Sequence, residues 1–445
     1  MTGGARAFVD AICDPRRIEA QLRRLAARAR GPRLARLVQD GLRLQRMVEE
    51  AGRTSALVAR ALADGSFAPG TVTLRTAHIG TRERRLAALP PLDLVVHGVI
   101  ADVLAERLEP RLSPHLFSYR RGRSSWTALR MLARGVTRHR RQHAQPAARG
   151  LFVLRADVQD FTDSWPIDDG APLWPELRRL TGLPEDGAHW HMLRRLLVPE
   201  IVSPASPAAA GATAAPPGER RGVLFGAPTT NVLANFYLAS LDEQLTAVPD
   251  LLYARFGDDI FCAHPDLGVL RAAEATLLRT LTARGLRLNQ GKVRRLFWNG
   301  AGRRSPAAPE IPGTTQVAFL GGTLRFSGGV GLSPRKWSAL LADLRGRVRR
   351  TARLMPGAGA GEVAQALVGV VNQSLSLHSP LATDYAPLLA DLVSDRHQLK
   401  QLDGLLALWV AEAATRRRGV RALRDLPWRR LRELGLRSLV QERNR

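Results

Sequence analysis

The chain has 445 residues, 45% of them hydrophobic, and its 66 Lys and Arg outnumber 40 Asp and Glu to give a formal net charge of +26. This length and apolar content exclude a disordered chain and allow two or three packed subdomains. Its two cysteines exclude a disulfide framework. The basic excess favours nucleic acid as the partner, because a basic surface releases counterions when it binds phosphates.

The amino-acid pattern is not that of a membrane protein. No uncharged run reaches the roughly 18 residues of a spanning helix. Charged residues also interrupt the N-terminus before the apolar core of a signal peptide could form. We therefore expect a soluble, cytoplasmic protein with no membrane association.

Helical spacing dominates both ends of the chain. Apolar residues recur at helical intervals through residues 15–64, which predicts a helical N-terminal segment. Arginine-rich helices are expected within residues 92–143; their arginines suit a face that binds RNA, and a solvated surface explains them equally well. Beyond Pro334 the pattern predicts helices at residues 334–355, 361–378, 381–413 and 427–443.

The middle of the chain predicts strands that end in carboxylates. The apolar run at residues 151–158 indicates a buried strand that delivers Asp157 at its end. Residues 252–262 predict a hairpin that carries Asp258 and Asp259 at its turn. Adjacent carboxylates repel, so a bound cation accounts for the pair, although turn chemistry alone also favours Gly-Asp-Asp. Three carboxylates brought together would suit two Mg²⁺ ions and nucleotidyl transfer.

Five further segments follow one another in an order similar to that of bacterial reverse transcriptases. They are Arg85 with the stretch at 89–97, Ser-Tyr-Arg-Arg-Gly-Arg-Ser at 118–124, the block at 222–238 with Leu241-Asp242, Leu-Arg-Leu-Asn-Gln-Gly-Lys at 286–292, and Val-Ala-Phe-Leu-Gly-Gly at 317–322. Each motif is short, and their order over residues 67–345 carries the likeness. The chain resembles the retron, abortive-infection and defence-associated branch more than the related group II intron enzymes.

This resemblance implies an α+β fold of the right-hand polymerase type. Its fingers and palm would combine an antiparallel sheet with helices, and its thumb would be helical. The implied domains are a helical N-terminal extension at 1–66, fingers at 67–150, a palm at 151–330 with Pro/Ala/Gly-rich insertions near 203–221 and 299–315, and a thumb with the C-terminal region at 331–445.

The resemblance also implies an RNA-directed DNA polymerase and its site. The catalytic residues would be Asp157, Asp258 and Asp259. These three, together with Val158, would hold two Mg²⁺ ions, with Mn²⁺ as an alternative. The implied substrate-binding residues are Arg85, Thr162, Phe225, Gly226 and Lys292. The implied partners are an RNA template, nascent DNA, dNTPs and a defence-system protein, with a dedicated noncoding RNA copied for antiviral defence.

Departures from the family pattern keep alternatives open. Thr162 stands where the family usually has an aromatic ring that excludes a ribose 2′-hydroxyl, and residues 224–226 read Leu-Phe-Gly in place of Pro-Gln-Gly. A small side chain leaves room for a ribonucleotide. The first alternative is therefore a polymerase that makes RNA, or an untemplated, repetitive or protein-primed product. The second is a non-catalytic RNA-binding scaffold.

Overall fold

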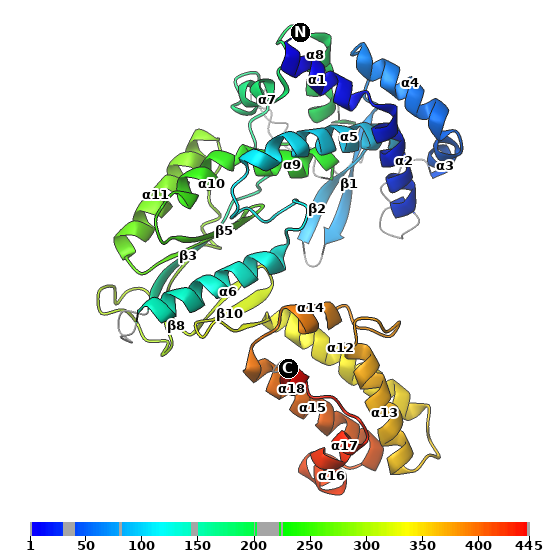
Figure 1. Ribbon diagram of the computed structural model, residues 1–445, viewed down its shortest axis with the longest axis vertical. Coiled ribbons are helices and arrows are strands. Elements are labelled where there is room, and N and C mark those ends of the chain that lie inside the picture. The colour runs from blue at the N-terminus through cyan, green and yellow to red at the C-terminus, as the bar shows by residue number, and fades with distance from the viewer. Residues whose placement is uncertain are drawn as a thin grey trace, which may run out of the picture. The chain divides into compact units, whose positions relative to one another are not determined.

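The computed structural model describes residues 2–29, 41–79, 82–143, 150–199, 201–202, 222–223 and 226–442 (Figure 1). It confirms the predicted α+β class, since helices are combined with sheets rich in antiparallel pairs. The chain divides into two compact units. The first unit comprises Met1–Ser124, Arg155–Ile260 and Arg271–Val293. The second unit comprises Ser125–Leu154, Phe261–Leu270 and Arg294–Arg445.

A helix that is largely buried lies at the centre of the first unit. This helix, α5 (Pro91–Leu108), buries residues on every side, which is typical of a helix enclosed by others. It packs against α1, α2, α7 and α9. The helices of this unit are α1 (Gly3–Ile12), α2 (Pro15–Ala29), α3 (Gly41–Glu49), α4 (Ala51–Ala63), α5, η1 (Glu109–Arg111), α7 (Leu173–Thr181), α8 (Ala188–Leu197), α9 (Pro228–Tyr237), α10 (Ala239–Thr246) and most of α11 (Leu267–Ala283).

The predicted N-terminal helices are confirmed wherever the structure describes them. Helices α2, α3 and α4 fall within residues 15–64, of which residues 30–40 lie outside the described part. A small sheet of order β2-β1-β4 belongs to the same unit. Its strands are β1 (Val72–Ile79), β2 (Arg82–Ala88) and β4 (Ile201–Val202), with β1 antiparallel to β2 and parallel to β4.

A five-stranded sheet carries the predicted carboxylates. Its order is β5 (Leu252–Phe256), β6 (Asp259–His264), β3 (Leu151–Asp157), β7 (Arg294–Trp298) and β8 (Gly313–Thr314). The central strand β3 is buried on both faces, which explains why it reads as an almost unbroken apolar run. The predicted insertion at 299–315 forms turns and strand β8, and the one at 203–221 lies outside the described residues.

The second unit combines an antiparallel sheet with a helical region. Helix α6 (Ser125–Gln142) packs on β10 (Gly322–Arg325) and β11 (Val330–Leu332), and β10 also pairs with β9 (Gln316–Phe319). In the helical region α12, α13 and α15 pack on one another. Its helices are α12 (Pro334–Arg353), α13 (Ala360–Leu375), α14 (Ala386–Asp391), α15 (Arg396–Thr415), α16 (Val420–Asp425), α17 (Trp428–Glu433) and α18 (Leu439–Glu442).

Two of the predicted C-terminal helices are wrong as single elements. The helix expected at 381–413 is split into α14 and α15, because the backbone N–H groups of Ser394 and Asp395 donate to the Val330 carbonyl at 2.7 and 2.9 Å. The Asp395 side chain then caps α15. The helix expected at 427–443 is interrupted at Gly435, whose φ of 93° is incompatible with a helix. Within the described residues we find no helix with the length and apolar character to span a bilayer.

Candidate active site

The turn between β5 and β6 presents two carboxylates side by side. Gly257 and Asp258 connect the strands, and Asp259 begins β6. Gly257 has a φ of 63°, a left-handed conformation that glycine adopts without strain. A Cβ at this position would meet no atom within 4 Å, so the backbone angle, and not the available space, requires glycine here. The hairpin predicted from the sequence is confirmed.

Backbone hydrogen bonds bring the end of β3 beside this turn. The Val158 N–H donates to the Asp258 carbonyl at 3.2 Å. On the other side the Asn289 N–H donates to the Asp157 carbonyl at 2.8 Å, and the Gln159 N–H donates to the Arg287 carbonyl at 2.9 Å. The end of β3 is therefore fixed between the hairpin and the segment at 286–292, which the sequence had linked to it only by resemblance.

The three carboxylates act on one another electrostatically. Burial first, and then the negative charges of Asp258 and Asp157, raise the pKa of Asp259 to about 6. The nearby cations Arg155 and Lys292 oppose this rise. Like charges held this closely disfavour full ionisation, and a bound cation would relieve the repulsion. Asp157, Asp258 and Asp259 therefore lie close enough to interact electrostatically, and we call them the carboxylate cluster.

Lys292 lies in the same cluster. Its Nζ donates to Asp157 Oδ2 at 2.6 Å, and the Asp157 side chain is almost fully buried. Among the described residues, no three Asp, Glu, His or Cys side chains surround one point as a complete set of metal ligands. In the arrangement seen here the Asp157 carboxylate is instead paired with an ammonium group. The donor chemistry still fits Mg²⁺, because carboxylate and carbonyl oxygens are its preferred protein ligands.

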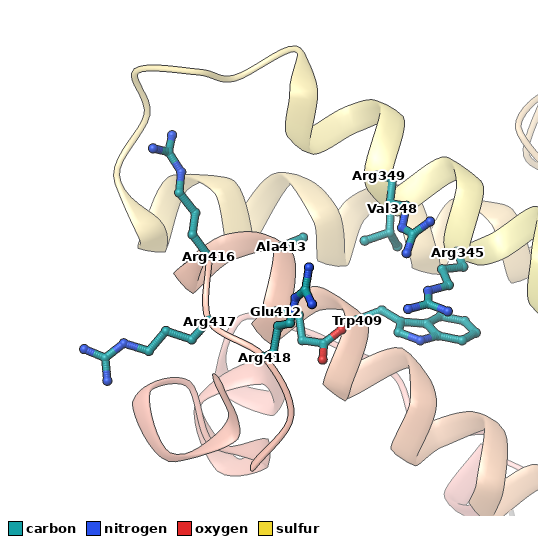
Figure 2. A pocket seen from close by; sticks show the side chains of 9 residues that line it. All are labelled: Arg345, Val348, Arg349, Trp409, Glu412, Ala413, Arg416, Arg417 and Arg418. Atoms are coloured by element: carbon teal, nitrogen blue, oxygen red, sulfur yellow. The ribbon is translucent and has the colours of Figure 1, made fainter. Parts of the chain in front are cut away.

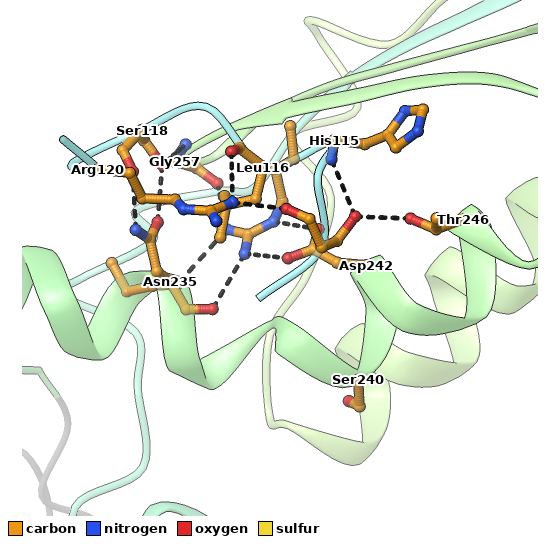
Figure 3. Close-up of polar contacts among 12 residues, drawn as sticks. His115, Leu116, Ser118, Arg120, Asn235, Ser240, Asp242, Thr246 and Gly257 are labelled. Atoms are coloured by element: carbon orange, nitrogen blue, oxygen red, sulfur yellow. Dashed lines mark hydrogen bonds and ion pairs between the residues drawn. The ribbon is translucent and has the colours of Figure 1, made fainter. Parts of the chain in front are cut away.

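A buried ion pair between β5 and α10 holds the β5–β6 hairpin in place. The guanidinium of Arg255, in β5, donates to both carboxylate oxygens of Asp242, in α10, which is labelled in Figure 3. The Tyr253 hydroxyl donates to the same carboxylate at 2.6 Å. Arg255 Nη1 also donates to the Gly257 carbonyl at 3.0 Å. The arginine therefore ties the turn between β5 and β6 to helices α9 and α10, since Nη2 reaches the Asn235 carbonyl at 3.1 Å.

A second set of hydrogen bonds holds the turn from the loop before α6. Ser118 Oγ accepts from the Gly257 N–H at 2.9 Å and donates to Asn235 Oδ1 at 2.7 Å (Figure 3). Asn235 Nδ2 returns a hydrogen bond to the Ser118 carbonyl at 2.7 Å. Three motifs that lie far apart in the sequence thus meet at Gly257. No role for Arg255 is predicted from the sequence. The feature that could have indicated a buried ion pair is an arginine inside an otherwise apolar strand.

The predicted nucleotide-binding residues are only partly assembled. Thr162 is half-buried, and its carbonyl accepts from the Val223 N–H at 2.9 Å, which brings the loop after β3 against the segment that leads to Gly226. Gly226 is exposed, and Phe225 lies outside the described residues. Arg85 lies in β2 opposite Thr76, in a sheet separate from the one that carries the carboxylates.

Comparisons with known proteins give a distant likeness. No known family and no curated protein matches the chain. Among solved structures it is similar to telomerase from Candida albicans in complex with a TWJ fragment of telomeric RNA, at 11% identity and a TM-score of 0.44, covering 77% of this chain and 59% of that chain. Apo telomerase from Candida tropicalis gives 8% identity and a TM-score of 0.43, covering 78% of this chain and 57% of that one. The chain spans less than two thirds of those structures, and likeness at this level carries no activity over to it.

Proposed function

We propose that the chain is an RNA-directed DNA polymerase of the right-hand type, with the palm at 151–330, fingers at 67–150 and a thumb in the helices beyond 331. The observation that carries this proposal is the cluster of Asp157, Asp258 and Asp259, which two strand ends bring together beside Lys292. The order of the sequence motifs and the net charge of +26 support it.

The proposed reaction extends a primer by one nucleotide. The primer 3′-hydroxyl oxygen attacks the α-phosphorus of a nucleoside triphosphate and gives up its proton to water. A new P–O bond forms, the bond from the α-phosphorus to the bridging oxygen breaks, and pyrophosphate leaves. The three carboxylates, with the Val158 carbonyl, would hold two Mg²⁺ ions, or Mn²⁺ in their place. Such ions, when bound, supply charge stabilisation to the attacking and leaving oxygens.

Lys292 has a defined part in this proposal. Its ammonium group neutralises Asp157 in the arrangement seen here, at 2.6 Å. The side chain is about one-third exposed, so it can turn toward an incoming triphosphate. Lys292 would then exchange a carboxylate for phosphate oxygens and leave Asp157 free as a ligand. The four-carbon stem and three rotatable donors of lysine suit such an exchange.

The template proposed is RNA, and a dedicated noncoding RNA copied in an antiviral defence system is the biological setting that the family resemblance favours. Nascent DNA and dNTPs would complete the set of substrates, with a cytoplasmic location and a partner protein of the defence system. The basic composition supports a nucleic-acid partner through counterion release.

A second candidate function is a polymerase with relaxed or protein-primed synthesis. Thr162 favours relaxed sugar selection, because its side chain is small and half-buried in the loop after β3. Protein priming needs an accessible tyrosine hydroxyl. The hydroxyls of Tyr237 and Tyr253 are buried and donate to Arg284 and Asp242. Tyr119 is 53% exposed and its ring lies 6.3 Å from that of Phe256, whereas Tyr385 is half-buried, so Tyr119 is the candidate primer beside the hairpin.

The test is synthesis by the purified chain with the nucleic acid that it retains. Mg²⁺ and labelled dNTPs or rNTPs are added and the products sequenced. We expect DNA complementary to the bound RNA, and at least about a hundredfold less from an Asp258→Asn variant. Asp250→Asn is the matched control, since Asp250 is exposed and its φ of 57° is one that asparagine tolerates.

Each other outcome favours a different function. Ribonucleotide or template-free product would favour the second candidate. Product covalently attached to the protein and lost in Tyr119→Phe would favour protein priming. Tightly bound RNA with no synthesis under any condition would favour a non-catalytic RNA-binding scaffold.

A further inference from the structure

A strongly basic cavity lies within the helical region of the second unit. It has a volume of about 440 Å³ and lies between the middle of α12 and the C-terminal end of α15 (Figure 2). Arg345 and Arg349, one helical turn apart on α12, form one side. Arg418, in the turn that leads to α16, forms the other side, with Trp409 between them.

The arginines at this cavity differ in whether they are already paired. Arg416 donates to the Pro356 carbonyl at 2.7 Å, Arg417 pairs with Asp425 at 3.0 Å, and both side chains point away from Trp409 (Figure 2). In the part of the chain that the structure describes, Arg345, Arg349 and Arg418 form no ion pair with a carboxylate. Three guanidinium groups therefore remain available to a ligand.

The single acid that lines the cavity does not neutralise this group. Glu412 accepts from the Gly419 N–H at 2.8 Å, and so helps to fix the turn that carries Arg418. The guanidinium of Arg345 lies 5.9 Å from the centre of the Trp409 ring. This distance is within the range of a cation–π contact. The charge of the cavity lining is therefore predominantly positive.

We propose that this cavity binds a terminal phosphate or polyphosphate group, carried by the 5′ end of an RNA strand or by a free nucleotide. A volume near 440 Å³ falls in the range of small-ligand sites, whereas a duplex backbone needs an open surface. A terminal phosphate carries about two negative charges and three free oxygens, which several guanidinium groups can bind together. Internal phosphodiesters carry one charge each. The proposal does not depend on polymerase activity.

The test is binding by the full chain without divalent ions, so that the carboxylate cluster contributes no metal site. Fluorescence anisotropy compares one short RNA, labelled at its 3′ end, with a 5′-triphosphate, a 5′-monophosphate or a 5′-hydroxyl. We expect the triphosphate form to bind about tenfold more tightly than the hydroxyl form, as charge-assisted hydrogen bonds at a partly exposed site allow. Competition by unlabelled nucleoside triphosphate at similar affinity would identify the free nucleotide as the source.

Two neighbouring arginines on α12 provide matched variants. Arg349→Gln should abolish the preference for a 5′-phosphate. Arg350→Gln removes the same charge from an exposed residue that does not line the cavity, and should retain the preference. Arg349→Lys keeps the positive charge but loses the planar guanidinium with its paired donors, and should retain part of the preference for a 5′-phosphate. Equal affinity for all three 5′ ends, or an equal loss in Arg349→Gln and Arg350→Gln, would overturn the proposal.

Discussion

Arg255 and Asp242 are both fully buried and are joined by two hydrogen bonds, from Nε to Oδ1 at 2.7 Å and from Nη2 to Oδ2 at 2.6 Å. Replacing Arg255 by Met leaves the Asp242 carboxylate buried without its cation. We expect the free energy of unfolding to fall by about 3–5 kcal/mol, as measured by urea denaturation. The corresponding change at an exposed pair, Arg430→Met beside Glu433, should cost less than about 1 kcal/mol.

A double variant separates the two roles of this pair. Arg255→Met combined with Asp242→Leu removes both charges, and most of the lost stability should return. Nucleotide incorporation should stay reduced at least about tenfold, because the Gly257 carbonyl has still lost its donor. Full activity in the double variant would show that the pair serves the fold alone.

Ser118→Ala should lower activity by loosening the turn. The variant removes the acceptor for the Gly257 N–H and the donor to Asn235, and leaves two buried polar groups without these partners. We expect a loss of about 1–3 kcal/mol in stability and a larger proportional loss in kcat than in KM. Ser113→Ala is the control: Ser113 lies in the same loop as Ser118, and its hydroxyl bonds that of Thr246, at the end of α10, without touching the turn. Equal kinetic effects in the two variants would contradict a positioning role.

Asp259 should make the ion-free protein less stable as the pH rises. Its pKa is raised from 3.8 to about 6. Between pH 3.8 and about pH 6 the folded chain therefore keeps a proton on Asp259 that the unfolded chain has released. The free energy of unfolding therefore falls across this window, by an amount on the order of 3 kcal/mol. Asp259→Asn should remove this fall and be more stable than the wild type at pH 7, in pH-dependent denaturation with EDTA. Parallel curves for the two proteins would refute the raised pKa of Asp259.

Lys292→Gln should change metal and nucleotide binding in opposite directions. Without the ammonium group 2.6 Å from Asp157, the carboxylate cluster loses its nearest competing cation. Mg²⁺ affinity, measured by calorimetry without nucleotide, should rise several-fold, because about 1 kcal/mol corresponds to a factor of five. The KM for dNTP should rise at least about tenfold, through the lost phosphate contact. Loss of both affinities together would show that Lys292 acts on the fold instead.

Thr162→Phe should sharpen sugar selection. A ring in this half-buried position would occupy the space that a ribose 2′-hydroxyl needs. The ratio of kcat/KM for dNTP over rNTP should increase by about tenfold or more, with a smaller change for dNTP alone. Thr162→Val keeps the shape without the hydroxyl and serves as the control. An unchanged ratio in Thr162→Phe would place the sugar elsewhere.

The carboxylate-bearing elements were predictable because their signals are local. Strand β3 and the β5–β6 hairpin are short apolar runs that end in Asp157 and in Asp258-Asp259, and a few neighbouring residues determine each of them. The resemblance alone implied that the end of β3 lies beside the turn between β5 and β6. The backbone hydrogen bond from Val158 to the Asp258 carbonyl joins residues that no sequence period connects.

The features that were missed depend on contacts between distant segments. Residues 381–413 read as one helix because the break depends on Val330, a strand residue far upstream whose carbonyl binds Ser394 and Asp395. Likewise the sequence around Arg255, in strand β5, does not show that its partner Asp242 lies on helix α10. Arginines are mostly exposed, so sequence alone would place this one at the surface.

The hydrogen bonds that fix the end of β3 use main-chain atoms alone: Val158 to Asp258, Gln159 to Arg287, and Asn289 to Asp157. The spacing of the carboxylate-bearing backbones therefore depends in part on atoms that every residue type carries. A substitution that leaves these three backbone hydrogen bonds in place can leave that spacing unchanged.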